Sequence, residues 1–286
     1  MTMPTNSPYK TLKDSGWRFP PLQETFPEVF IIEFLREEDE EMGRLEGLRL
    51  ADTLRLADKQ PKYFYIRNKA ELALLAPIFV QSKYRYLHIS CHGGPEGFEL
   101  QDEFVKFDQF GEIFGGALAL RRFFVSACST GERSLVDALH NTSKGIQSII
   151  APCVDLYFSH ASVIWAALYV SLLERDNGSI RHQDIVSAMQ ILVELFPYAD
   201  SDGDSKKEPM KFMFAGYDST KDTGGTPNPD AWRIQEIQST PKKKTRRRKS
   251  KAKGKKAATK TPKPSRRVLA TNQRSESIKS PATSTP

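Results

Sequence analysis

Two short runs of the sequence decide the fold: Tyr-Leu-His-Ile-Ser-Cys-His-Gly-Gly at residues 86–94 and Phe-Phe-Val-Ser-Ala-Cys-Ser-Thr-Gly at residues 123–131. Each run is apolar and ends in small residues, which is typical of a buried parallel strand followed by a turn. In an open α/β sheet, ligands bind just beyond the carboxyl ends of the strands. If these two strands are neighbours, His92 and Cys128 therefore share one crevice.

A thiol beside an imidazole is the minimal apparatus for covalent acyl transfer. The imidazole takes the thiol proton and returns it to the leaving amine. Considered separately, each residue has a non-catalytic interpretation: His92 as a histidine in a surface turn, and Cys128 as an inert buried thiol. Their matching positions at two strand ends favour catalysis, so the pair indicates a cysteine peptidase.

The rest of the body alternates strands with helices. The predicted strands cover residues 29–34, 63–67, 84–90, 122–127, 147–152 and 211–217, and a hairpin arm covers residues 96–100. The predicted helices cover residues 41–57, 69–81, 107–118, 134–140, 160–174 and 181–196, and regular structure is expected to end near Trp232. This alternation predicts an α/β fold with a doubly wound, mostly parallel six-stranded sheet that has helices on both faces.

The charge of the chain is unevenly distributed. Residues 239–286 hold 17 of the 42 Lys and Arg residues and a single acid, Glu276. The whole chain has a net charge of +7, but residues 1–238 alone have a net charge of −9. The basic segment has no aromatic residues and no apolar period, so burial cannot offset the entropy lost on ordering it. We expect three parts: an N-terminal extension (residues 1–27), a globular domain (residues 28–236) and a disordered basic tail (residues 237–286).

The tail has the charge density that suits nucleic acid, which it would bind through counterion release without reading bases. A nuclear-import signal or a solubilising extension is the alternative interpretation. The tail therefore predicts nucleic-acid binding in addition to a protein or peptide substrate.

Other features restrict the class of protein. Three cysteines in 286 residues do not make a disulfide framework and favour a reducing compartment. No Cys or His spacing is typical of a metal site, so neither a metal nor another cofactor is expected. No secretory signal precedes the body, and the longest mainly apolar run, residues 163–173, is too short to span a bilayer. We expect a cytoplasmic protein, with nucleoid or nuclear association through the tail and no membrane partner.

A strand ending in His-Gly followed by a strand ending in Ala-Cys resembles the caspase-like cysteine peptidases, which include caspases, metacaspases, clostripain, gingipains and separase. The sequence around these motifs is similar to that of the CHAT-domain branch. It includes Gly-Phe-Glu-Leu-Gln-Asp at residues 97–102, between the two motifs. The resemblance covers residues 84–196 and, more loosely, the first two strands. It departs from the branch after the fifth strand, where Pro152-Cys153 stands in place of a common Trp.

The resemblance implies Cys128 as nucleophile and His92 as general base and acid. It also implies an oxyanion hole formed by the backbone N–H groups of Gly93 and Cys128, where a glycine lets substrate and backbone approach closely. A third catalytic member is not evident in the sequence, and Asp102 is more typical of a surface turn. Cys91 and His88 are predicted to be core residues, and Cys153 a packing residue or a resolving thiol.

The resemblance also implies a substrate pocket at the loop after the fifth strand. Asp155 in this loop would select Arg or Lys before the cut bond through a charge-assisted contact. Glu132 and Asp137 are other acids that could act in this way, and Asp155 could equally cap the next helix. The function predicted from the sequence is an intracellular regulatory or defence endopeptidase. The alternative is a non-catalytic scaffold of the same fold, or a nucleic-acid-associated protein, held by its basic tail.

Overall fold

The computed structural model describes residues 25–101, 103–143, 145–174, 180–199, 208–222 and 228–240. By contacts the chain divides into Met1–Lys242 and Lys243–Pro286, and every described residue belongs to the first of these units. Asp102 and nearly all of the predicted tail lie outside the described residues.

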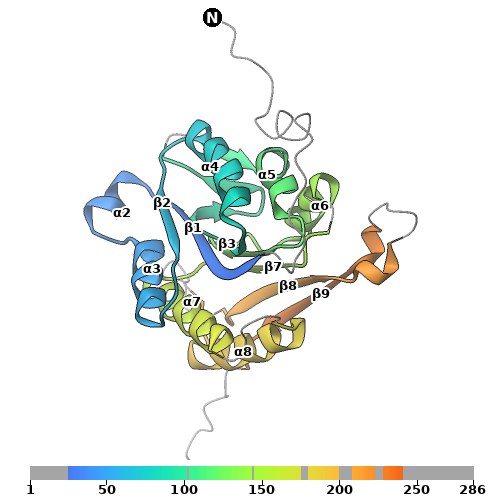
Figure 1. Ribbon diagram of the computed structural model, residues 1–286. Coiled ribbons are helices and arrows are strands. Elements are labelled where there is room, and N and C mark those ends of the chain that lie inside the picture. The colour runs from blue at the N-terminus through green and yellow to red at the C-terminus, as the bar shows by residue number, and fades with distance from the viewer. Residues whose placement is uncertain are drawn as a thin grey trace, which may run out of the picture. The chain divides into compact units, whose positions relative to one another are not determined.

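A central sheet organises the body (Figure 1). Its seven main strands are β1 (Phe26–Phe34), β2 (Lys62–Tyr65), β3 (Tyr84–Gly94), β6 (Arg122–Ser126), β7 (Ser148–Pro152), β8 (Lys211–Tyr217) and β9 (Trp232–Gln238). They lie in the order β2-β1-β3-β6-β7-β8-β9. The first five are parallel, whereas β8 and β9 are antiparallel to their neighbours. The predicted mostly parallel sheet is confirmed.

The predicted count of six main strands is wrong because the chain continues into β9. Regular structure does not end near Trp232, since residues from Trp232 to Gln238 pair with β8 along its whole length. Most side chains of β9 are exposed. An edge strand with so little burial has a weak hydrophobic pattern, which is why the sequence did not reveal it.

The predicted hairpin arm is present at the carboxyl end of β3. It consists of β4 (Gly97–Glu99) and β5 (Phe104–Lys106), which pair with each other in antiparallel fashion. β4 folds back on the end of β3, so that Glu99 lies opposite His92. The arm therefore extends the sheet beside the predicted catalytic histidine.

Helices cover both faces of the sheet. One face, here called the α5 face, carries α4 (Lys69–Ser82), α5 (Phe107–Phe114) and α6 (Arg133–Thr142). The other, the α7 face, carries α3 (Glu46–Leu56), α7 (Phe158–Leu173) and α8 (His182–Leu195). Alternate residues of each strand enter the two cores, as the pleat requires: Phe30 belongs to the α5 face and Ile31 to the α7 face. Short 3₁₀ turns cover Gly115–Leu118, Ser219–Lys221 and Pro229–Ala231.

The helix predicted over residues 41–57 is confirmed as α3 but begins later, at Glu46, and a separate short helix precedes it. A short helix, α2 (Glu37–Glu41), follows β1 and is separated from α3 by a turn. Gly43 in this turn has φ +67°, a left-handed conformation that glycine adopts readily and that ends a helix. The turn directs α2 back over the carboxyl end of the sheet, where it contributes to the site described below.

Candidate active site

The two strands that end in His92 and Cys128 are neighbours. β3 and β6 are parallel, with Ser90 opposite Ser126, so the residues two positions further along each chain emerge at the same edge of the sheet. His92 and Cys128 line one cavity of about 40 Å³. Its other lining residues are Glu46, Ser90, Cys91, Ser126, Ala127, Leu156, Phe158 and Ala161. The structure thus brings together the two residues on which the sequence prediction depends.

The turns after the two strands pack directly against each other at Gly93. A Cβ atom on Gly93 would lie 2.9 Å from Cβ of Ala127 and 2.8 Å from Cγ2 of Thr130. No real Cβ atom tolerates such contacts, so only glycine fits at this position. The close approach explains why a glycine follows His92, and it brings the backbone of residue 93 beside the segment that carries Cys128.

Cys128 lies at a sharp turn. The next residue, Ser129, has φ +54°, which is uncommon for a residue other than glycine. The turn is fixed to the loop after β7 by hydrogen bonds from Ser129 N to Val154 O (3.2 Å) and from Gly131 N to Pro152 O (2.7 Å). The Sγ atom of Cys128 accepts a hydrogen bond from the backbone N–H of Leu156, 3.4 Å away. The thiol is half-buried and faces the cavity.

His92 is held by an aspartate that the sequence analysis did not identify. Its Nε2 atom lies 2.6 Å from Oδ2 of Asp39 on α2. The other oxygen of Asp39 accepts a hydrogen bond from Nη1 of Arg44 at 2.7 Å. The imidazole ring meets the Phe158 ring edge-on, with centroids 5.6 Å apart. The ring of His92 is therefore fixed from two sides.

The Asp39 carboxyl group is ionised in this environment. Burial alone would raise its pKa, but the hydrogen bonds from His92 and Arg44 outweigh burial and lower the pKa below its ordinary value. An ionised carboxylate only accepts hydrogen bonds, so Nε2 of His92 carries the proton in this contact. In the neutral imidazole, Nδ1 is then the nitrogen with the free electron pair.

Asp39 escaped the sequence analysis because it lies in an acidic run. Glu37, Glu38, Glu40 and Glu41 surround it, and such a run is typical of a solvated helix face. One signal could have found it: the run follows β1, the neighbour of β3, and the strand-end rule applies to that strand too.

The acids predicted for the substrate pocket do not line this cavity. Asp155 is exposed, accepts a hydrogen bond from the Ser129 hydroxyl at 2.7 Å and does not line the cavity. It does not cap α7 either, because Tyr157 is the cap residue and makes no side-chain capping bond. Asp137 pairs with Arg133 on the exposed side of α6, and Glu132 precedes that helix.

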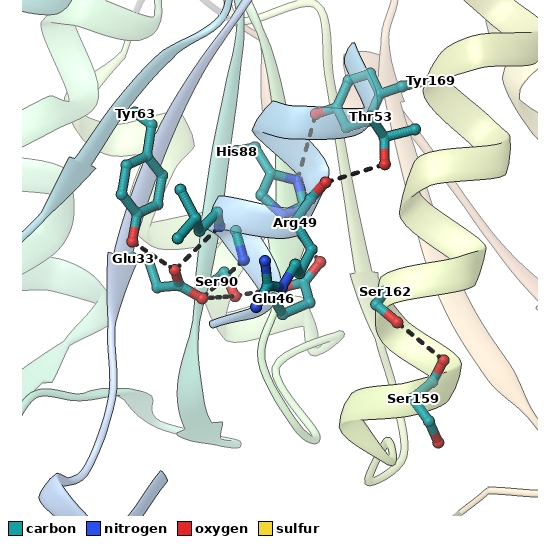
Figure 2. A network of polar contacts seen from close by, with 12 residues as sticks. Glu33, Glu46, Arg49, Thr53, Tyr63, His88, Ser90, Ser159, Ser162 and Tyr169 are labelled. Atoms are coloured by element: carbon teal, nitrogen blue, oxygen red, sulfur yellow. Dashed lines mark hydrogen bonds and ion pairs between the residues drawn. The ribbon is translucent and has the colours of Figure 1, made fainter. Parts of the chain in front are cut away.

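The acid that lines the cavity is Glu46, at the start of α3. Its side chain is 2% exposed, and one carboxylate oxygen bonds to the hydroxyl of Ser90 (Figure 2). The other, Oε1, makes no hydrogen bond and lies 3.9 Å from Nε2 of His88. The sequence predicts a helix over residues 41–57 and gives no sign that Glu46 is buried. A buried carboxylate oxygen without a partner is costly, so it marks a place where a polar or cationic group would bind favourably.

A second buried acid, Glu33, holds the segment that carries Glu46 in place. Glu33 on β1 accepts hydrogen bonds from Gly47 N (2.7 Å), Leu48 N (3.1 Å) and the hydroxyl of Tyr63 (2.7 Å) (Figure 2). Burial raises its pKa to about 7, and the hydrogen bonds limit that rise. Glu33 thus holds the first turn of α3 against the sheet and keeps Glu46 beside the cavity.

The other two cysteines have environments that suppress reactivity. Cys91 is buried with the core of the α5 face, as predicted, and burial raises its pKa well above the ordinary value. Cys153 is half-buried near Gly131 O, and burial raises its pKa to about 12. None of the three cysteines forms a disulfide. A thiol that stays protonated is a poor nucleophile, so neither neighbour competes with Cys128.

Within the described part of the chain, His, Cys, Asp and Glu side chains form no cluster suited to a metal ion. No helix there is long and apolar enough to cross a membrane.

Comparison with protein families and with curated proteins finds no match. Among solved structures, the chain is similar to the Arg-specific cysteine proteinase gingipain R, with a TM-score of 0.43 and 12% identity over 61% of this chain and 43% of that one. The complex of the Porphyromonas gingivalis RgpB pro- and mature domains has a TM-score of 0.43 and 12% identity, over 61% of this chain and 44% of that chain. A secreted C11 cysteine protease from Bacteroides thetaiotaomicron has a TM-score of 0.38 and 10% identity, over 67% of each chain. The chain thus spans less than half the length of the gingipain chains.

Proposed function

We propose that this protein is a caspase-like cysteine endopeptidase that uses Cys128 and His92, with regulation or defence inside the cell as its role. The observation that carries the proposal is the shared cavity: two neighbouring parallel strands end at its wall and present a thiol and an imidazole to it. The two sequence motifs favour the CHAT branch of the group.

In this mechanism, the Cys128 sulfur adds to the carbonyl carbon of the peptide bond while His92 holds the thiol proton. The backbone N–H groups of Gly93 and Cys128 donate to the oxyanion. The C–N bond then breaks, the proton passes from His92 to the leaving amine, and an acyl thioester remains on Cys128. Water hydrolyses the thioester: His92 takes a proton from the water and returns it to the sulfur as the carboxylic acid leaves.

We further propose that the enzyme selects Arg or Lys before the cut bond, with Glu46 rather than Asp155 as the selecting acid. Glu46 lines the cavity, and its Oε1 lacks a hydrogen-bond partner. A guanidinium or ammonium group would supply the missing partner, and the charge-assisted contact would be strong because the carboxylate is buried. Ser90 and Ser126 at the same cavity add hydroxyl groups that accept from such a group.

A second candidate rests on the composition of the tail: a scaffold of this fold, without catalysis, that is held on nucleic acid by residues 239–286. Seventeen Lys and Arg residues in that segment favour it. Deleting the segment should abolish DNA or RNA binding, and the binding should weaken steeply with salt before the deletion.

An activity-based probe tests the catalytic proposal. A peptidyl-Arg acyloxymethyl ketone should form one thioether, which peptide mapping locates to Cys128. The Cys128→Ala variant should not react, and His92→Ala should react roughly 10²- to 10⁴-fold more slowly. Cys153→Ala is the matched control, because it removes a half-buried thiol beside the same loop and should label normally. Equal labelling of Cys153 and Cys128, or labelling indifferent to His92, would refute catalysis.

Substrate peptides test the selectivity. Peptides with Arg before the cut bond should be cleaved at least about 10²-fold better than the same peptides with Leu, because the unmatched carboxylate would stay unpaired. Glu46→Gln should reduce that ratio, whereas Asp155→Asn should leave it unchanged. An Arg-to-Leu ratio near one in the unmodified protein would remove Glu46 from this role.

A further inference from the structure

We propose that Asp39 is a positioning residue for His92: it fixes the proton of the imidazole on Nε2 and turns Nδ1 toward Cys128. This inference rests on the proposed function and adds a third member to a site that the sequence presents as a pair. Its basis is the contact of 2.6 Å between Asp39 Oδ2 and His92 Nε2.

The two oxygens of Asp39 have separate partners. Oδ2 contacts His92, while Oδ1 accepts from Arg44, whose guanidinium lies 2.7 Å away. Arg44 also places its guanidinium carbon 5.7 Å from the centre of the Phe158 ring, the same ring that meets His92 edge-on. Arg44, Asp39, His92 and Phe158 thus form one closed set of contacts, in which the carboxylate cannot rotate without losing a charged partner.

The backbone around Asp39 is held in place as well. Arg44 N donates to Asp39 O at 2.9 Å, which closes the turn after α2. On either side of Asp39, Arg36 pairs with Glu99 on β4 (2.6 Å) and Glu40 pairs with Arg67 (2.5 Å). The first contact closes the turn locally, and the two ion pairs tie residues 36–41 to β4 and to the segment after β2. A helix so short would not hold a carboxylate in register by itself, so the surrounding contacts supply the precision that positioning needs.

The other charged groups near His92 interact mainly with partners other than the imidazole. Glu99 lies opposite His92 in the arm, but both of its oxygens are bonded to Arg36, at 2.9 and 2.6 Å. Arg44 is paired with Asp39, and Cys128 lines the same cavity as His92. Asp39 is therefore the carboxylate that contacts the imidazole directly, and Glu99 acts on it at longer range.

The consequence is chemical. With the proton held on Nε2, neutral His92 offers the Nδ1 electron pair to the thiol proton of Cys128, and the ionised carboxylate stabilises the imidazolium that forms. An Asn at position 39 would keep the shape but could present its NH₂ group to Nε2. The imidazole would then carry its proton on Nδ1, which cannot accept one from the thiol.

The test compares Asp39→Asn with Asp39→Glu in the full-length protein, and with Asp52→Asn as a matched control. Asp52 is an exposed acid on α3 that pairs with Arg55, so the same chemical change is made away from the site. Nitrogen NMR of the His92 ring above its titration range should show the proton on Nε2 in the unmodified protein and in Asp52→Asn. It should show a shift of the proton toward Nδ1 in Asp39→Asn.

Kinetics give the second measurement. Asp39→Asn should lower kcat for peptide cleavage by roughly 10²- to 10⁴-fold with little change in KM, because the carboxylate orients the base and does not touch the substrate. Asp39→Glu should recover part of the loss. Iodoacetamide should alkylate Cys128 more slowly in Asp39→Asn than in Asp52→Asn.

The outcomes separate this inference from the proposed function. An imidazole tautomer and a Cys128 alkylation rate that do not change in Asp39→Asn would overturn the positioning role, even if the protein cleaves peptides. A tautomer that changes as expected, in a protein that neither reacts with the probe nor cleaves peptides, would support the role of Asp39 in orienting His92 and would overturn the peptidase proposal instead.

Discussion

The two faces of the sheet are packed with different chemistry. On the α5 face, aromatic rings dominate: Phe110 stacks on Phe114 and on Phe123, each with ring centroids 5.2 Å apart. On the α7 face, the polar groups Glu33, Glu46, His88 and Ser90 are buried (Figure 2). The His88 ring lies 5.3 Å from the Trp165 ring and 5.7 Å from the Tyr169 ring, between centroids. The candidate active site opens between the strand ends, with Glu46 and Phe158 from the α7 face in its wall.

The difference separates stability from function. Apolar burial on the α5 face is favourable without further conditions, because no polar group there needs a partner in the stacked aromatic cluster. On the α7 face, each buried polar atom needs a partner, and Glu46 Oε1, His88 Nε2 and Trp165 Nε1 have none. Unsatisfied buried groups lower stability and occur where function requires them. We therefore infer that the α5 face stabilises the fold and that the α7 face accepts a cost to shape the site.

The largest expected effect on stability comes from removing one ring of the aromatic cluster. Phe110→Ala should lower the free energy of unfolding by about 3–5 kcal/mol, since a fully buried ring is lost and a cavity remains. Urea denaturation measures the change. Phe104→Ala on β5 is the control, because that ring is 46% exposed and its removal leaves little cavity. A loss below about 1.5 kcal/mol for Phe110→Ala would mean that the α5 face is not the main source of stability.

The second prediction concerns pH and the α7 face. The pKa of Glu33 is raised in the folded protein, mainly by burial, to about 7 from 4.5. The folded state holds this proton more tightly than the unfolded state, so the contribution to stability is full below pH 4.5 and is lost as the pH rises through 7. The expected loss between pH 4.5 and pH 8 is up to about 3 kcal/mol.

Glu33→Gln should remove this part of the pH dependence, because an amide does not ionise. Urea unfolding at pH 5, 6.5 and 8 compares the slopes of the two proteins. Asp52→Asn serves as the control, since an exposed acid should leave the slope unchanged. A Glu33→Gln protein with the same slope as the unmodified protein would show that Glu33 titrates normally and that burial on the α7 face is less costly than inferred.

The sequence was sufficient for the parts that follow from strand patterning. Residues 84–90 and 122–127 are apolar and end in small residues, so neighbouring strands and a shared crevice for His92 and Cys128 could be predicted. Asp39 and Glu46 could not, because their local sequences are charged and amphipathic, which is typical of solvent-exposed helices. Only the fold brings α2 over the end of β3 and buries the start of α3. Tertiary contact, rather than local pattern, decides the environment of such residues.

The smallest expected effect concerns a charged residue that is buried on the α5 face. Arg121 is 1% exposed, its Nε makes no hydrogen bond, and its guanidinium lies over the ring of Phe79, 5.8 Å from the centroid. Burial, and then the nearby Arg85, lower its pKa to about 10. Arg121 therefore stays charged at neutral pH, but its charged form is less stable in the folded protein than in water.

Arg121→Met should raise the free energy of unfolding by about 1 kcal/mol at pH 7. The methionine keeps most of the apolar stem and removes the desolvation cost of an unpaired charge, and the lost cation–π contact offsets part of the gain. The gain should be constant below pH 10 and should shrink as the pH rises above 10, because the arginine then loses its charge in the folded state. Arg49→Met on the exposed side of α3 is the control and should change stability by less than about 0.5 kcal/mol. If Arg121→Met destabilises the protein instead, the guanidinium contributes to the α5 face, and the contrast between the two faces is weaker than their aromatic and polar residues indicate.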